Sequence, residues 1–173
     1  PNKLKNGEII PVYKKKDPLK KDNFRPVVLL SHLSKVVERL MHKQISSFME
    51  NKLSEYMTGF RKNHGTQHSL VAMIENWKKA LDKGEYISSL FMDLSKAFDT
   101  INHDLLLAKL EGYDFSENSV EFMHSYLKNR NQRVQINNSF SDSKIFKIGV
   151  PQGSIIGPLL FNLFERFYCN CRT

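Results

Sequence analysis

Residues 90–106 read LFMDLSKAFDTINHDLL and place a carboxylate, Asp93, at the end of an apolar run. The pattern from Tyr86 to Asp93 predicts a strand that packs in a core. An ionised carboxylate inside such a strand is costly unless it is paired, binds a metal or lies at the strand's end. Two interpretations follow from these residues alone: Asp93 ends the strand and caps a turn, or it binds Mg²⁺ there.

The segments on both sides of this stretch alternate between strand and helix patterns, so we expect one mixed domain of helices and strands. Over residues 34–53, apolar residues such as Val36, Leu40 and Met41 recur at three- and four-residue spacing and predict a long amphipathic helix. We expect strands over 9–13, 26–30, 86–93, 133–138 and 144–148, and helices over 34–53, 66–84 (capped by Thr66), 102–110, 118–127 and the end of 150–164.

Charge is the strongest signal in the composition. The 173 residues hold 26 Lys and Arg against 18 Asp and Glu, a net charge of +8. Residues 1–83 carry 17 basic and 8 acidic side chains, whereas residues 84–173 carry 9 and 10. A concentration of positive charge in one half favours a polyanionic partner such as a nucleic acid.

Membrane insertion and secretion are not expected. The sequence has no apolar run of the length that spans a bilayer, and its first residues lack the apolar core of a signal peptide. We therefore expect an intracellular protein without a membrane partner. No feature of the sequence selects the nucleus over the cytoplasm, or one oligomeric state over another.

Four blocks in a fixed order carry a resemblance to a known family. They are IIPVYKKKDPLKKDNFRPVVLLSHLSKVVERLMHKQ (9–44), TGFRKNHGTQHSL (58–70), SLFMDLSKAFDTINHDLLLAKL (89–110) and GVPQGSIIGPLLFNLF (149–164). Together they resemble the reverse transcriptase (RNA-directed DNA polymerase) domain of non-LTR retrotransposons, the long interspersed element type, over about residues 7–164. The resemblance implies an α+β right-hand polymerase fold, with residues 1–85 as the fingers portion and 86–173 as a partial palm with an inserted fingers-type hairpin.

The same resemblance implies an RNA template, a DNA primer, deoxynucleoside triphosphates and two Mg²⁺ ions as ligands. In this family the Asp of the third block binds both metals, which selects Asp93, with the backbone carbonyl of Leu94 as a further ligand. Phe98 matches an aromatic residue that lies against the sugar of the incoming nucleotide and leaves no room for a 2′-hydroxyl. Plain core packing is the alternative for Phe98.

The strands over residues 9–13 and 26–30 are expected to form a hairpin with a lysine-rich loop. This basic hairpin matches the part of the family that contacts the nucleotide's phosphates. The resemblance selects Lys15 there, with Lys14 as a near alternative, together with Arg25, whose planar fork suits phosphate oxygens. Gln152 and Gly153 match residues around the incoming nucleotide and the template base. An ordinary turn before a helix is the alternative for these two.

Four further residues need a choice. Arg61 and Lys62 match residues beside the template backbone, with surface solvation as the alternative. Asp99 lies one residue past Phe98, and we expect it to cap the next helix rather than bind metal. We expect His103 to be a first-turn residue of that helix rather than a catalytic base.

The sequence departs from the family after the fourth block. The family continues there into a hairpin bearing a Tyr/Phe-x-Asp-Asp motif, whereas no Asp follows Asp142 here. The first residue is Pro1, and we expect a piece of a longer reading frame that is catalytically incomplete as it stands, because one carboxylate does not hold two Mg²⁺ ions against hydration. The alternatives are a basic nucleic-acid-binding remnant without chemistry and a degraded copy that does not fold stably.

Overall fold

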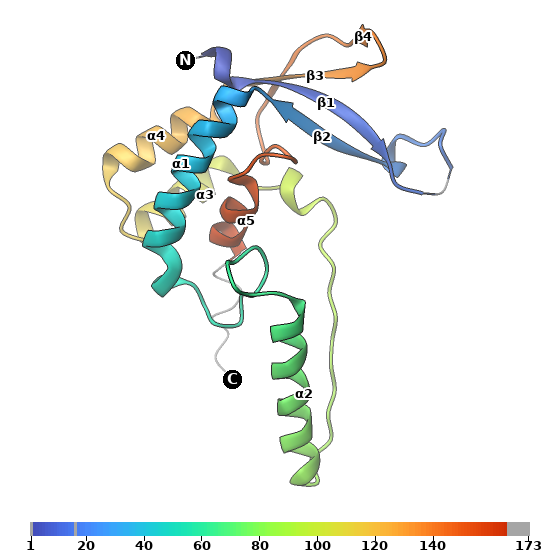
Figure 1. Ribbon diagram of the computed structural model, residues 1–173, viewed down its shortest axis with the longest axis vertical. Helices are drawn as coiled ribbons and strands as arrows, with labels where there is room; N and C mark the ends of the chain where they lie inside the picture. Colours follow the sequence, from blue (N-terminus) through green and yellow to red (C-terminus); the bar gives the residue numbers. More distant parts are fainter. Residues whose placement is uncertain (1, 16, 166–173) are drawn as a thin grey trace.

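The computed structural model describes residues 2–15 and 17–165. Strands β1 (Asn6–Tyr13) and β2 (Phe24–Leu30) form an antiparallel hairpin, in register from Gly7 opposite Leu30 to Tyr13 opposite Phe24. Both predicted strands are confirmed. The connection includes a short 3₁₀ turn, η2 (Lys21–Asn23), and the hairpin projects from the body of the molecule (Figure 1).

The hairpin joins the rest of the sheet through β1. Strand β3 (Arg130–Ile136) runs parallel to β1, with Asn6 opposite Asn131, and pairs in antiparallel fashion with β4 (Ser139–Phe140) and β5 (Lys144–Phe146). The sequence predicted strands at β3 and β5, with bounds a few residues different, and none at β4. A 3₁₀ turn, η1 (Asn2–Lys5), precedes β1.

The hydrophobic core lies among helices rather than against a sheet face. Helices α1 (His32–Met49), α3 (His103–Gly112), α4 (Glu117–Leu127) and α5 (Gly157–Glu165) pack together beside the sheet (Figure 1). A 3₁₀ turn, η3 (Glu50–Lys52), ends the segment predicted as one long helix. The buried apolar side chains of this cluster are Met41, Ile45, Met49, Ile101, Leu106, Leu110, Tyr113, Val120, Met123, Leu127, Val150, Ile156, Leu159, Leu160 and Leu163.

The buried face of α1 differs from the predicted one. Val36 and Leu40 are 51% and 60% exposed, whereas the buried positions are Ser34, Glu38, Met41, Ile45 and Met49. These five positions also follow three- and four-residue steps, so they form one stripe. The prediction followed apolar residues alone and therefore missed that two polar residues belong to the buried stripe.

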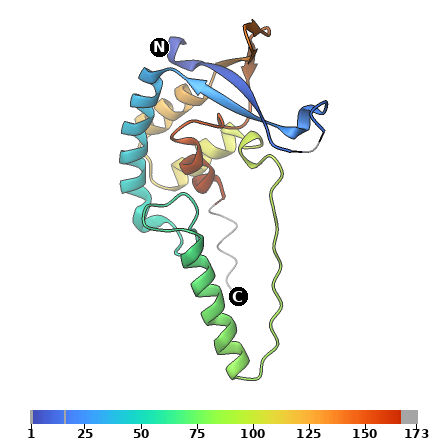
Figure 2. The ribbon, with the colours of Figure 1, turned by 45° about the vertical axis from the view of Figure 1, so that its right-hand side comes forward.

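Helix α2 (Thr66–Asp82) projects away from the other helices (Figures 1 and 2). None of its residues is buried. Gly65 occupies its N-cap position without a side-chain hydrogen bond, and Thr66 is the first helical residue, so the predicted Thr66 cap is wrong. The helix ends as predicted, with Gly84 just beyond it at a φ of +73°.

The predicted strand over residues 86–93 is not formed. These residues run as an extended segment that returns from the end of α2 toward the body (Figure 2). Leu90, Phe91 and Met92 are 83%, 77% and 83% exposed, so they form no core. A strand needs a hydrogen-bonded neighbour. Among the described residues, the sheet is built only from β1 to β5 and none of these strands pairs with the segment.

Within residues 2–15 and 17–165, no helix has the length and apolar character needed to cross a membrane.

Candidate functional site

A cleft of about 960 Å³ lies where the β1–β2 hairpin, residues 92–99 and the loop over residues 150–156 meet. Its lining combines positive charge from the hairpin, carboxylates and an aromatic ring from residues 92–99, and an amide from the loop. The residues concerned are Lys14, Lys21, Asp22, Arg25, Asp93, Leu94, Lys96, Phe98, Asp99, Gln152 and Phe161, with apolar residues between them.

The hairpin contributes the positive side of the cleft. Lys14 follows β1, and its backbone N–H donates to the carbonyl of Asn23, which closes the hairpin at that level. Arg25 lies on β2 opposite Val12. Both side chains are exposed and line the cleft. Lys15, the first choice from the sequence, is exposed and does not line the cleft, so the geometry favours its neighbour Lys14.

Asp93 and Leu94 reach the cleft on the segment from α2. Asp93 is exposed, because the strand expected to enclose it is not formed. The charge of Asp93 is therefore not buried, so it carries no desolvation cost that a metal or another partner has to offset. The chain then turns through Lys96, which has a φ of +55°, into the 3₁₀ turn η4 (Ala97–Asp99). The Lys96 ammonium lies 3.7 Å from a carboxylate oxygen of Asp22 on the hairpin, an exposed pair that contributes little stability.

Phe98 packs against the core and also lines the cleft. It is half-buried. Its ring centroid lies 5.2 Å from that of Phe161 on α5 and 6.0 Å from that of Phe60. These contacts hold the ring at the wall of the cleft between the core and the open space.

The loop over residues 150–156 closes one side of the cleft. The Val28 N–H donates to the Gln152 carbonyl at 2.6 Å, and the Gln152 side-chain amide donates to a carboxylate oxygen of Asp99 at 3.1 Å. Gly153 has a φ of +109°, and a Cβ at this position would lie 2.8 Å from the Val28 carbonyl oxygen. Glycine is therefore required for the loop to approach β2 this closely.

Asp99 is not the helix cap predicted from the sequence. Asn102 is the N-cap of α3, and its side chain accepts from the Leu105 N–H at 3.0 Å. Asp99 instead faces the cleft and orients Gln152. His103 is the first residue of α3, as expected, and one of its ring nitrogens is 2.7 Å from the Gly149 carbonyl oxygen.

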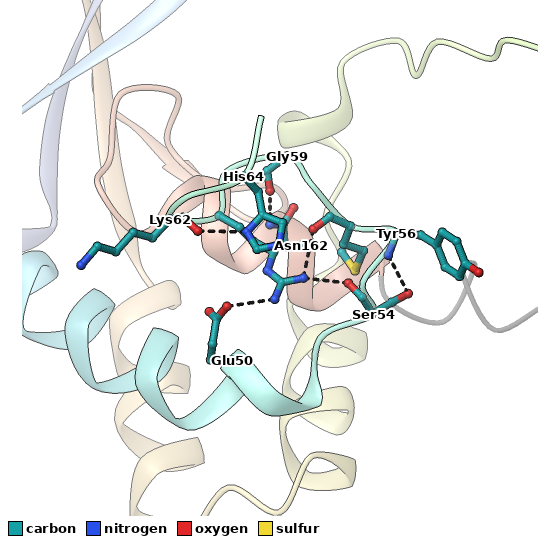
Figure 3. A network of polar contacts seen from close by, with 9 residues as sticks. Glu50, Ser54, Tyr56, Gly59, Lys62, His64 and Asn162 are labelled. Carbon is teal, nitrogen blue, oxygen red and sulfur yellow. Dashed lines mark hydrogen bonds and ion pairs between the residues drawn. The ribbon is translucent and has the colours of Figure 1, made fainter. Parts of the chain in front are cut away.

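Arg61 and Lys62 lie outside the cleft and differ sharply in exposure; Figure 3 shows the Lys62 side chain and the polar contacts near it. The Arg61 side chain is 8% exposed; its guanidinium pairs with Glu50 at 2.9 Å and donates to the carbonyls of Ser54 and Met57. This placement favours a role in holding its own loop. Lys62 is exposed and extends away from the network, where a polyanion can reach it.

The donor set of the cleft suits a hard cation. Three residues with carboxylate side chains, Asp22, Asp93 and Asp99, line it, and Mg²⁺ prefers oxygen ligands. In the part of the chain that the structure describes, no three acidic, His or Cys side chains are grouped closely enough to form a metal centre. Asp93 thus fits as one ligand of a metal site, not as a complete one.

Two residues whose side chains bond to the loop over residues 150–156, Asp99 to Gln152 and Glu38 to the Ile155 N–H, were missed by the sequence interpretation. Asp99 was assigned to capping, although Asn102 three positions later is an equally good cap and stands directly before the helix. Glu38 was not considered, although its spacing from Met41, Ile45 and Met49 places it on their face of α1. A charged residue at a core position of a helical pattern was the available signal.

The chain matches a family described as "Reverse transcriptase (RNA-dependent DNA polymerase)" over residues 13–167. It is 34% identical over 167 residues to "Probable RNA-directed DNA polymerase from transposon BS" of Drosophila melanogaster, covering 95% of this chain and 18% of that protein. It is 35% identical over 151 residues to "RNA-directed DNA polymerase from mobile element jockey" of Drosophila funebris, covering 86% and 16%. The chain thus spans about a fifth of the length of these relatives.

A solved structure shares the fold. An apo telomerase from Candida tropicalis, truncated from its C-terminal domain, superposes with a TM-score of 0.60 at 16% sequence identity, covering 96% of this chain and 39% of that one. At this identity the likeness concerns the fold, which is the α+β right-hand polymerase fold expected from the sequence.

Proposed function

Because the chain belongs to the reverse transcriptase family, in the branch of non-LTR retrotransposon RNA-directed DNA polymerases, we propose that its cleft binds the incoming deoxynucleoside triphosphate. One observation carries this proposal. Basic residues of the hairpin, Asp93 with Phe98, and Gln152 come from three separate parts of the chain and line the same cleft. The substrates are an RNA template, a DNA primer and deoxynucleotides.

Each residue has a role that its chemistry supports. Arg25 and Lys14 bind the triphosphate from the hairpin side, where a guanidinium fork and an ammonium can both reach its oxygens. Phe98, held by two aromatic neighbours, blocks the space of a 2′-hydroxyl and so selects deoxynucleotides. Gln152 and Gly153 lie against the base pair being formed.

Asp93 and the Leu94 carbonyl would hold Mg²⁺ at the cleft. When bound, the metal supplies activation of the primer 3′-hydroxyl and neutralisation of the charge that develops on the phosphates. The 173 residues contain no second acidic motif after the fourth block. We therefore propose that this polypeptide, taken alone, binds nucleotide but does not extend a primer.

Lys14→Ala is expected to weaken binding of a fluorescent deoxynucleoside triphosphate about 3- to 10-fold, since one charge-assisted contact to phosphate is lost. Lys15→Ala is the matched control, because the neighbouring lysine is equally charged and exposed but does not line the cleft. Equilibrium titration in Mg²⁺ measures both constants. A larger loss for Lys15→Ala would move the phosphate contact to the residue first selected from the sequence.

A second candidate function, nucleic-acid binding without chemistry, is favoured by the charge distribution. Residues 1–83 carry 17 basic side chains against 8 acidic ones. Binding of this kind would fall steeply with salt and would not depend on Mg²⁺ or on Asp93. The proposed polymerase site predicts that nucleotide binding depends on Mg²⁺ and on Asp93, so the two candidates are separable.

Lys62→Ala is expected to weaken binding of single-stranded RNA and to reduce the salt slope by about 0.7, the share of one phosphate contact, without changing stability. Arg61→Ala is the contrasting variant. It removes a buried, paired guanidinium, and we expect a loss of about 2 kcal/mol in unfolding free energy instead. Fluorescence anisotropy at several salt concentrations and urea unfolding distinguish them. A reduced salt slope for Arg61→Ala with unchanged stability would contradict this assignment.

A further inference from the structure

A buried carboxylate connects helix α1 to the loop of the cleft. Glu38 is 1% exposed, and burial of a carboxylate is costly unless hydrogen bonds replace its water. One carboxylate oxygen accepts from the Tyr126 hydroxyl at 2.7 Å, and the other accepts from the Ile155 N–H at 2.7 Å. The two bonds join α1, α4 and the loop over residues 150–156.

We propose that Glu38 is a positioning residue for the cleft: its bond to the Ile155 N–H fixes the loop and thereby the place of Gln152. The proposal rests on the proposed function only for the identity of the ligand that Gln152 faces. Glu38 itself does not line the cleft. Its effect on the cleft is therefore transmitted through the backbone from Ile155 to Gln152.

The bond from the Ile155 N–H to Glu38 holds the loop beyond Gly153, where Ile156 is also buried and the Ser154 hydroxyl accepts from the Gly157 N–H. The Gln152 carbonyl accepts from Val28 of β2, and the Gln152 side chain donates to Asp99 of η4. Gly153 follows, with a φ of +109° and the conformational freedom of glycine. Beyond it, Glu38 holds the Ile155 amide. The bond thus restrains the loop on the far side of Gly153.

The surroundings of Glu38 favour a strong, persistent contact. Burial raises the pKa of the Tyr126 hydroxyl, which therefore stays protonated and keeps donating at neutral pH. The guanidinium of Arg130, itself 2% exposed, lies 4.7 Å from the Tyr126 ring centroid, so a buried cation lies beside the residue that donates to Glu38. Hydrogen bonds to an ionised acceptor are about twice as strong as neutral ones.

Amide hydrogen exchange measured by NMR on the full 173-residue chain tests the proposal. In Glu38→Ala we expect the Ile155 amide to exchange about 30-fold faster, and in Glu38→Gln about 3- to 10-fold faster, because a neutral acceptor is weaker. The Gln152 side-chain amide resonances shift in the same order. The Leu106 amide, in the first turn of α3 and bonded to the Asn102 carbonyl, belongs to a residue whose side chain lies in the core; it is the internal reference and stays unchanged.

Tyr126→Phe is the companion variant, because it removes the bond to the other Glu38 oxygen and the interaction of the hydroxyl with Ser154 but keeps the bond from the Ile155 N–H to Glu38. It should leave Ile155 exchange within about 3-fold of the starting chain. Equal acceleration at Ile155 and Leu106 would show a general loss of stability and overturn the proposal. Unchanged exchange at Ile155 would overturn it too. If Glu38→Ala does not fold, Glu38→Gln decides by the same criteria.

Titration with a fluorescent deoxynucleoside triphosphate separates this inference from the proposed function. Weaker binding by Glu38→Gln, with the Leu106 amide unchanged, supports both. Failure of the unsubstituted chain to bind nucleotide overturns the proposed function, whereas the exchange rates of Ile155 still decide whether Glu38 positions the loop.

Discussion

Asp93→Asn is expected to lower RNA-templated primer extension about 10³-fold or more in a chain that carries the acidic hairpin of the family. We call this chain, extended by a family hairpin bearing the Tyr/Phe-x-Asp-Asp motif, the restored chain. The substitution keeps the shape of the side chain and removes the charge that would hold Mg²⁺. Metal stabilisation of the developing charge lowers the activation free energy by several kcal/mol, and each change of about 1.36 kcal/mol in that barrier changes the rate tenfold.

Asp82→Asn is the matched control for this prediction. Asp82 is an exposed carboxylate at the end of α2 and does not line the cleft. Single-turnover extension of a labelled primer, measured over a range of Mg²⁺ concentrations, gives both rates. A loss of less than about tenfold for Asp93→Asn would remove this residue from the metal site.

Gly149→Ala is expected to lower the free energy of unfolding by about 3 kcal/mol. Gly149 has a φ of +83°, and a Cβ there would lie 2.8 Å from backbone atoms of Phe98 and Asp99. Backbone atoms do not move aside cheaply, because the Gly149 N–H donates to the Ile101 carbonyl and the Val150 N–H to the Phe98 carbonyl. The change therefore displaces the loop of the cleft from η4.

Gly84→Ala separates this contact from the backbone conformation. Gly84 also has a positive φ, +73°, but a Cβ there has no atom within 4 Å. We expect only the conformational cost of about 1 kcal/mol at Gly84. Urea unfolding followed by circular dichroism compares the variants. Equal losses at both positions would mean that the close approach to Asp99 has no energetic weight.

Much of the local structure was predictable because it depends on neighbouring residues. The β1–β2 hairpin follows from two short strand patterns around a polar connection, and α3 begins where Asn102 can cap it. These signals lie within a few residues of the structure they specify. The same holds for Gly84 at the end of α2.

The errors involve contacts between distant parts of the chain. Residues 86–93 have a strand-like pattern, but a strand also needs a neighbour, and none of the described strands lies beside them. Asp99 looks like a cap until the loop 53 residues later brings Gln152 to its side chain. The spacing of Glu38 places it on the buried face of α1, but only Tyr126 and Ile155, distant in the sequence, supply the two donors that its burial needs.

The candidate site, too, was predictable in part: which residues belong to it followed from the sequence, but some of their contacts did not. The resemblance of four sequence blocks selected residues from separate segments, and the structure brings Arg25, Asp93, Leu94, Phe98 and Gln152 to one cleft. The choice between Lys14 and Lys15 needed the geometry of the hairpin, since the two residues are chemically identical. The placement of Arg61 needed its partners, because an arginine in a loop is equally suited to Glu50 and to a phosphate.

Primer extension on an RNA template, with deoxynucleotides and Mg²⁺, tests the central claim most directly. The unsubstituted 173-residue chain and the restored chain are compared side by side. We predict no extension by the 173-residue chain, and extension by the restored chain that uses deoxynucleotides in preference to ribonucleotides. Extension by the 173-residue chain alone, abolished by Asp93→Asn, would contradict the account, because carboxylates within these residues would then complete the metal site.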